Sequence, residues 1–234
     1  MSKSHRHHLK HEVHGRWIKE VVFGVHDGVL TVLGFVSGAA ALLPNPRIIF
    51  FTGLASMFAE GLSMGVGEYQ SSCAENEILL RNIAEEKEEI KRYPKDERQA
   101  LARYFSRRGV AHWEAKKIAK ELSRRQERFL EVVLKTERGL SPQSFESPLK
   151  NSYFMGIASF IGGGLPIISY AFWDKTPALI GSIILSGVTV FLLGVLKTRY
   201  TKQDPWRTGG KMMALAMATA LIAYAIGEWL SWFY

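Results

Sequence analysis

The chain has 234 residues, of which 22% are charged, and a formal net charge of +8. A mean hydropathy of −0.01 is typical of a basic soluble protein only if apolar and charged residues are mixed, and here they are segregated into blocks. The single cysteine, Cys73, excludes an intrachain disulfide and any multi-cysteine metal site.

Five apolar blocks are each long enough to cross a bilayer as one helix, which takes about 20 residues. They cover residues 20–42, 49–70, 151–173, 178–196 and 212–233. A polar block between the second and third holds more than half of the charged residues. We therefore expect an all-α membrane protein with five transmembrane helices and a cytoplasmic helical insert between the second and third. The predicted order is a tail (1–19), two spans (20–70), the insert (71–148) and three spans (149–234).

Basic residues predict the orientation of these spans. Lysine and arginine recur in the tail, in the insert and in the 197–211 loop, whereas the 43–48 and 173–177 loops hold one each. Because short loops rich in Lys and Arg stay on the cytoplasmic side, the first three segments should be cytoplasmic and the C-terminus should lie on the opposite side.

The N-terminal tail contains five histidines among basic residues: His5, His7, His8, His11 and His14. It fits a metal-binding tail, but we favour a flexible basic arm or the remnant of a purification tag. We expect no cleavable signal peptide, because the first apolar run is too long and lacks a small-residue cleavage site.

The first span carries His26 and Asp27 about seven residues in from its predicted cytoplasmic start, a depth of roughly 10 Å. An ionisable side chain at this depth indicates a functional site that faces a partner or a water-filled cavity. The alternative for Asp27 is a helix-packing hydrogen bond, favoured by Gly24 and Gly28 beside it. His26 is rotated by about 100° from Asp27 and could point elsewhere.

The second span carries Glu60, Met64 and Glu68, which lie four residues apart and so share one side of the helix. A carboxylate at membrane depth costs at least roughly 2.5 kcal/mol, which again indicates function. Met64 by itself fits a gap-filling core residue equally well. Glu60 lies mid-membrane, one turn deeper than Met64, and is a candidate proton relay.

Antiparallel pairing of these two spans predicts that Asp27 lies level with Met64 and Glu68. A mixed carboxylate and thioether set suits a borderline ion such as Fe²⁺ better than Mg²⁺ or Ca²⁺. A desolvated carboxylic acid holds its proton when the site is empty, while a divalent cation requires the ionised form, so metal binding would release protons. Glu228 in the fifth span is either an exit-side acid or an interfacial residue.

The polar block reads as helices. The second span continues without a break until Pro94, and three shorter helices follow at 95–108, 110–125 and 126–138. Gly109 ends the first of the three and Gly139 the last. Their apolar positions predict a small packed subdomain built on Leu101, Phe105, Ile118, Leu122, Phe129 and Val133.

The start of this insert holds a run of acids that could share a cation across one helix face: Glu85, Glu86, Glu88 and Glu89. Because lysines and arginines are interspersed, periodicity alone favours a solvated face with internal ion pairs. The basic segments fit contact with an anionic leaflet, and we expect no nucleic-acid partner because no recognition fold is evident. Without a phosphate-binding glycine loop, ATP-driven transport is not predicted.

Two stretches carry a resemblance to a known family. FGVHDGVLTVLGFVSGAAA, followed by GLASMFAEGLSMGVGEYQS, resembles the first two spans of the vacuolar iron transporter family, with its N-D-G element in the first helix and its S-M-x-x-G-E-[YF] element in the second. The later segments fit in the right order, so the resemblance covers nearly the whole chain. His26 stands where the family usually has Asn.

This resemblance implies a homodimer of five-span subunits that exports Fe²⁺, and sometimes Mn²⁺, from the cytoplasm in exchange for protons, with no prosthetic group. It implies that Asp27, Met64 and Glu68 line the path. The membrane would be the cell (inner) membrane in a prokaryote and a vacuolar-type membrane in a eukaryote. A small-residue stripe in the first span motivates the dimer hypothesis: Gly24, Gly28, Gly34 and Gly38.

The resemblance also implies metal binding by the insert. The family's glutamate positions match Glu86, Glu89, Glu97 and Glu137. The partner of Glu97, however, is Ala100, and the family's Met pair is replaced by Val133 and Leu134. We therefore expect fewer or weaker insert sites, with a reservoir or sensor role at most.

Two other classes of function remain as alternatives to the exporter. One is a metal-dependent intramembrane enzyme such as a lipid-head-group transferase, which Asp27-Gly28 suggests but which lacks the additional closely spaced aspartates that would hold its metal. The other is a metal-sensing membrane scaffold whose insert is the active part. We expect transport rather than catalysis.

Overall fold

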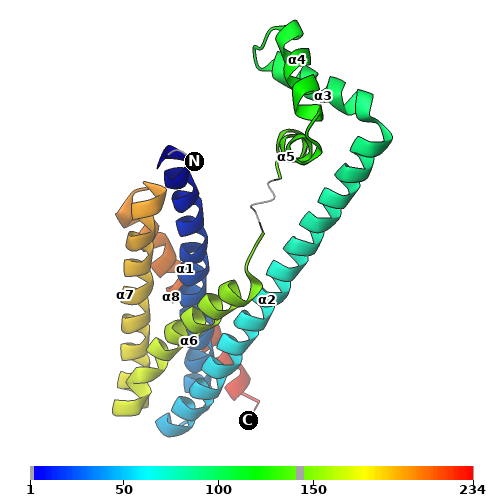
Figure 1. Ribbon diagram of the computed structural model, residues 1–234. Helices are drawn as coiled ribbons and strands as arrows, with labels where there is room; N and C mark the ends of the chain where they lie inside the picture. Colours follow the sequence, from blue (N-terminus) through cyan, green and yellow to red (C-terminus); the bar gives the residue numbers. More distant parts are fainter. Residues whose placement is uncertain (1–2, 141–144, 234) are drawn as a thin grey trace. The chain divides into compact units, whose positions relative to one another are not determined.

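The computed structural model describes residues 3–140 and 145–233. For residues 3–17 and 200 it describes the backbone but not the side chains. The described part of the chain is all-helical (Figure 1). The helices are α1 (Lys3–Leu42), α2 (Pro46–Arg92), α3 (Pro94–Arg107), α4 (His112–Ser123), α5 (Gln126–Glu137), α6 (Pro148–Phe172), α7 (Lys175–Thr201) and α8 (Pro205–Ser231). Five of them, α1, α2, α6, α7 and α8, are long and apolar enough to cross a membrane. The predicted all-α, multi-pass membrane protein is confirmed.

The chain forms two compact units. One combines 1–70 with 148–234 and contains the membrane-spanning segments, and the other is the insert, 71–147. Helix α2 contributes its first half to the membrane unit and its second half to the insert. Helix α1 starts at Lys3, so it continues through the histidine-rich tail, whose histidine side chains lie outside the described residues.

Helix α1 is the central element of the membrane unit and packs against α6, α7 and α8. Its glycines make this possible, because backbone meets backbone where they stand. Gly28 lies directly against Ser159 of α6, and Gly38 lies against the Ala223 carbonyl of α8. The small-residue stripe that motivated the dimer hypothesis is therefore used for packing within the chain, and this part of the sequence interpretation was wrong. Close helix approach in a bilayer requires small residues, whichever helix is the neighbour.

A short connection sets the register between α1 and α2. Only residues 43–45 separate the two helices, and the Asn45 side chain caps the new helix by accepting a 2.9 Å hydrogen bond from the Arg47 backbone N–H. Gly53 of α2 then faces Val36 of α1. Counting back along α1 and forward along α2 from this pair brings Asp27 level with residues 60–62 of α2.

The insert has the expected helical pattern. Helix α2 ends at Arg92, before Pro94, and positive backbone φ angles at Gly109 (93°) and Gly139 (67°) follow α3 and α5. Its core includes Leu101, Phe129 and Val133, with Phe105 and Leu122 packed around them. Ile118, expected in this core, is 39% exposed. Ala115 and Ala119 of α4 are buried instead, because small side chains let α4 approach its neighbours closely.

Candidate functional site

Two acidic side chains meet inside the membrane unit. Asp27 on α1 and Glu60 on α2 form a side-chain hydrogen bond, and both residues are partly buried. Asp27 was expected level with Met64 and Glu68, but its partner lies one helical turn from Met64 and two turns from Glu68. The tight 43–45 connection accounts for this difference, because it leaves no slack for α2 to slide along α1.

Met64 and Glu68 lie on the same partly buried face of α2 as Glu60. The glycines of this face pack against α6: Gly61 meets Gly156 and Phe160, and the Ser152 hydroxyl donates a 2.7 Å hydrogen bond to the Gly65 carbonyl. The sequence-predicted stripe on α2 therefore faces protein, and α6 forms one of its walls.

His26 occupies a different side of α1 from Asp27. It lines a cavity of about 500 Å³ together with residues of α7 and α8, among them Lys197 and Met212. Its Nε2 atom is buried and has no hydrogen-bond partner. The histidine that replaces the family's usual asparagine is thus not brought to the carboxyl pair with Glu60.

Sequence reasoning missed one acid of the first span. Glu20 on α1 is only 7% exposed, and its carboxylate lies 3.7 Å from the Lys19 ammonium. It precedes Asp27 by seven residues, nearly two full turns, so both lie on one face of the helix. That spacing was the available signal. By the register of α1 and α2, Glu20 is level with Glu68. Glu228, the weakest sequence candidate, is exposed on α8.

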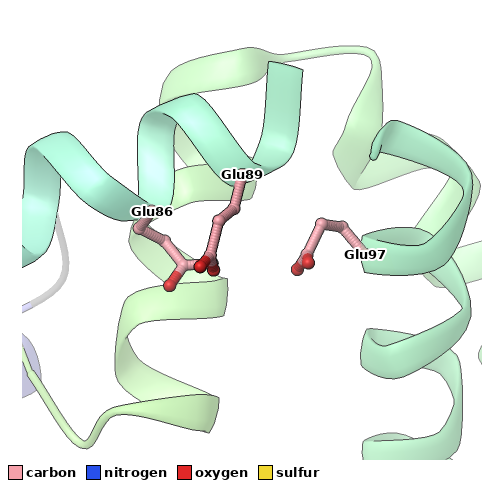
Figure 2. A group of neighbouring side chains, drawn as sticks. All are labelled: Glu86, Glu89 and Glu97. Carbon is pink, nitrogen blue, oxygen red and sulfur yellow. The ribbon is translucent and has the colours of Figure 1, made fainter. Parts of the chain in front are cut away.

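The insert gathers a second set of carboxylates. Glu86 and Glu89 project from the second half of α2 and Glu97 from the start of α3, with their carboxyl groups turned toward one another (Figure 2). One oxygen from each lies within 4.8 Å of the others. Pro94 creates this geometry: it ends the long helix, and the chain turns so that α3 faces back onto α2.

Two oxygens of this acidic cluster, Glu86, Glu89 and Glu97, are left without partners. Glu86 is 1% exposed, and its Oε1 makes no hydrogen bond. Glu97 Oε2 is also buried and makes no hydrogen bond. Buried polar atoms are normally satisfied, so two carboxylate oxygens without partners on members of one acidic cluster indicate a place for a cation. An all-carboxylate set suits a hard divalent cation such as Mn²⁺.

Glu137, the fourth predicted ligand, borders the cluster from the end of α5. Burial raises the pKa of Glu97 to about 6, and the carboxylate of Glu137 is the largest electrostatic contributor, followed by Glu86 and Glu89. The pKa of Glu137 is also raised, by burial first and then by Glu86 and Glu89. Each group destabilises the charge of the other, as expected for acids that lack a full complement of counter-charge.

The two departures from the family pattern have structural explanations. Val133 and Leu134 are both fully buried and belong to the packed interior of the insert. Ala100 is partly buried and provides no ligand atom. Sequence reasoning also missed Arg138, whose guanidinium contacts the cluster: its Nε donates a 2.8 Å hydrogen bond to Glu86 Oε2.

Known proteins place these observations in context. The chain is 27% identical to vacuolar iron transporter 1 of Eucalyptus grandis, over 93% of this chain and 85% of the relative. It is 25% identical to the vacuolar iron transporter of Plasmodium falciparum (isolate 3D7), over 95% and 85% of the two chains. Vacuolar iron transporter 1 of Arabidopsis thaliana is 23% identical over 95% and 90%.

A family model also matches the chain, over nearly its whole length. The model of the VIT family matches residues 18–228, from the start of the first apolar span to near the end of the last. The match includes the Asp27–Glu60 pair, the glycine contacts of α1 and the whole insert. A five-span helical chain that matches over this length belongs to the VIT family.

Proposed function

We propose that this protein exports divalent transition metal, Fe²⁺ and also Mn²⁺, from the cytoplasm in exchange for protons. The observation that supports this most directly is the hydrogen-bonded pair of Asp27 and Glu60 between two spanning helices. Membership of the VIT family, and relatives named vacuolar iron transporters, supply the class of cargo.

The chemistry of the exchange follows from the carboxyl pair. Two carboxyl groups form a hydrogen bond only when one of them carries a proton. A divalent cation binds the ionised form, so its arrival between Asp27 and Glu60 expels the proton, and its departure restores the hydrogen bond. Each state excludes the other, and this exclusion couples metal movement to proton movement.

We propose that the path begins at Glu20 and Glu68. These two acids stand at the same level, about two turns from the carboxyl pair and toward the predicted cytoplasmic side. Met64 lies between Glu60 and Glu68 on the same face of α2 and supplies a soft thioether, which binds Fe²⁺ more favourably than Mg²⁺ or Ca²⁺. His26 is left outside this path.

Reconstituted vesicles test the coupling. Metal entry, followed with a metal-sensitive dye inside, should be accompanied by proton movement in the opposite direction, followed with a pH-sensitive dye. We expect Asp27→Asn and Glu60→Gln to lower both signals together, because each removes one carboxylate from the pair. The matched control is Glu228→Gln, which removes an exposed acid from α8 and should leave both signals intact. Normal flux in Asp27→Asn vesicles would rule out this site.

We further propose that the protein works as a homodimer, on the basis of the family resemblance. Because the α1 glycines are used within the chain, we place the interface on the exposed apolar face of α2, which includes Phe58, Leu62 and Val66. In a Cys73→Ser background, Leu62→Cys should form an intermolecular disulfide. Ile184→Cys, equally exposed on α7, should not. A monomer by light scattering with detergent correction would contradict the dimer.

For the insert we propose a metal-reservoir or sensor role, supported by the two orphaned oxygens of Glu86 and Glu97. Glu86→Gln combined with Glu89→Gln should lower the affinity of the full chain for Mn²⁺ in calorimetry. Unchanged affinity would mean that Glu86 and Glu89 do not bind the metal. Neither catalysis by an intramembrane site nor a purely scaffolding role is needed to explain these features.

A further inference from the structure

The insert carries its own cation beside the acidic cluster. The guanidinium of Arg138 donates from Nε to Glu86 Oε2 at 2.8 Å and lies 3.5 Å from Glu89 Oε2 and 3.6 Å from Glu85 Oε2. Its side chain is 30% exposed, so the group is partly withdrawn from water. One guanidinium thus pairs with three carboxylates, and two of these, Glu86 and Glu89, belong to the cluster in Figure 2.

The backbone holds Arg138 in this place. Arg138 ends α5, and its N–H donates a 3.1 Å hydrogen bond to the Leu134 carbonyl. Gly139 follows with a φ of 67°, and the Leu140 N–H returns to the same carbonyl at 3.1 Å. A helix end closed in this way fixes the backbone at Arg138. The contact with Glu86 is therefore set by local structure as well as by charge.

The Glu86 carboxylate requires such a partner when the cluster holds no metal. It is 1% exposed, and a buried carboxylate without an opposite charge is strongly unfavourable. Arg138 satisfies Oε2 and leaves Oε1 free. Because the Glu86 carboxylate belongs to the cluster with Glu89 and Glu97, guanidinium and metal ion would draw on the same two carboxylates, Glu86 and Glu89.

We propose that Arg138 is a built-in counter-ion of the insert, whose guanidinium neutralises Glu86 in the metal-free protein and lowers the affinity of the acidic cluster for a divalent cation. An adjacent arginine weakens the hold of a carboxylate on a proton by roughly 10- to 1,000-fold. The positive charge of the guanidinium repels a divalent cation as it repels a proton, and the cation carries twice the charge. This inference rests on the proposed metal-binding role of the insert and adds the residue that sets its affinity.

Calorimetry with Mn²⁺ on the full-length protein at pH 7.5 tests the proposal. The double variant Glu86→Gln/Glu89→Gln identifies the part of the signal that belongs to the insert. Arg138→Gln keeps a hydrogen-bond donor but removes the charge, and we expect it to bind Mn²⁺ in the insert at least roughly tenfold more tightly than the parent. Arg138→Lys retains the charge and should stay near the parent affinity.

The matched control is Arg124→Gln. Arg124 also lies in the insert, at the end of α4, and pairs with Glu121 at 2.8 Å, but both side chains are more than half exposed and neither belongs to the cluster. Its removal changes the net charge equally and should leave the affinity unchanged. An increase equal to that of Arg138→Gln would reduce the effect to net charge and overturn the proposal.

Hydrogen exchange supplies a structural measurement on the same proteins. Without metal, Arg138→Gln should exchange faster at 82–92 and 126–140, because Glu86 loses its counter-charge, and Mn²⁺ should restore protection. Arg138→Met, a second neutral variant that also lacks the hydrogen-bond donor, provides the same comparison. For a variant that folds only with metal, the Mn²⁺ concentration that restores protection serves as the measure of affinity. The proposal is overturned if both neutral variants bind Mn²⁺ no more tightly than the parent. It is also overturned if the insert of the parent protein does not bind Mn²⁺. The vesicle transport assay tests the proposed exporter separately.

Discussion

Glu97 is the residue through which proton binding would affect the proposed metal binding of the insert. Its carboxyl group lies in a partly buried position among Glu86, Glu89 and Glu137, and burial and these charges raise its pKa to about 6. At neutral pH it is ionised but close to protonation. A modest acidification would therefore weaken the metal binding that we propose for the cluster.

The raised pKa of Glu97 predicts the pH dependence of stability. In the unfolded chain its pKa is near 4.5, and in the fold it is about 6, so the folded state binds more protons between these values. The free energy of unfolding should therefore fall as pH rises from about 4.5 to about 6, and the loss should persist above that window. Glu97→Gln should flatten this part of the profile, measured by thermal unfolding of the metal-free protein. An unaltered profile would contradict the assignment.

The same residue predicts how metal binding depends on pH. Because a metal ion needs ionised Glu97, the Mn²⁺ affinity of the insert should rise between pH 5 and pH 7 and then level off. Glu97→Gln should bind more weakly and with a shallower pH profile. Glu121→Gln, an exposed acid of the same insert, is the control and should behave like the parent.

At the scale of single elements, α1 determines how the membrane unit packs. Its glycines bring α6 and α8 to backbone contact, and its short connection to α2 sets which acids share a level. A methyl group added at a glycine should therefore change the stability measurably. The sign of the change should depend on which atoms the added Cβ would meet.

Gly28→Ala and Gly67→Ala should change stability in opposite directions. A Cβ at position 28 would collide with the Ser159 carbonyl and meet Gly163 N at 3.0 Å, whereas a Cβ at position 67 would meet nothing within 4 Å. We expect the first variant to lose about 1–3 kcal/mol through overpacking. The second should gain up to about 1 kcal/mol from the better helix former. Equal shifts of melting temperature in detergent would contradict the packing described for α1 and α6.

At the scale of the whole molecule, the distribution of Lys and Arg predicts one orientation for all five spans. In intact cells, and in a Cys73→Ser background, a membrane-impermeant maleimide should label Lys175→Cys at the start of α7. It should not label Glu114→Cys in the insert until the membrane is opened. Labelling of Glu114→Cys in intact cells would reverse the predicted topology, and with it the direction of export.

The sequence by itself determined the all-helical class, the five spans, the family and the end of α2 before Pro94, because these depend on the length of apolar runs, on proline and on motif spacing. It also indicated Glu60, Asp27, Glu86 and Glu89, since acids are conspicuous at membrane depth or three apart on a helix. Such features are local, so they can be predicted from one stretch of the sequence without knowledge of the rest of the fold.

Only the tertiary structure decided which of these residues meet. The pairing of Asp27 with Glu60 depends on the register of two helices, and a slip of one turn would have matched Met64 instead. The use of the α1 glycines within the chain, the turning of Ile118 away from the core and the arrival of Arg138 at Glu86 depend equally on helix rotation and packing. A pattern of residues gives the face of each helix, but the partner of that face is chosen by how all the helices fill space together.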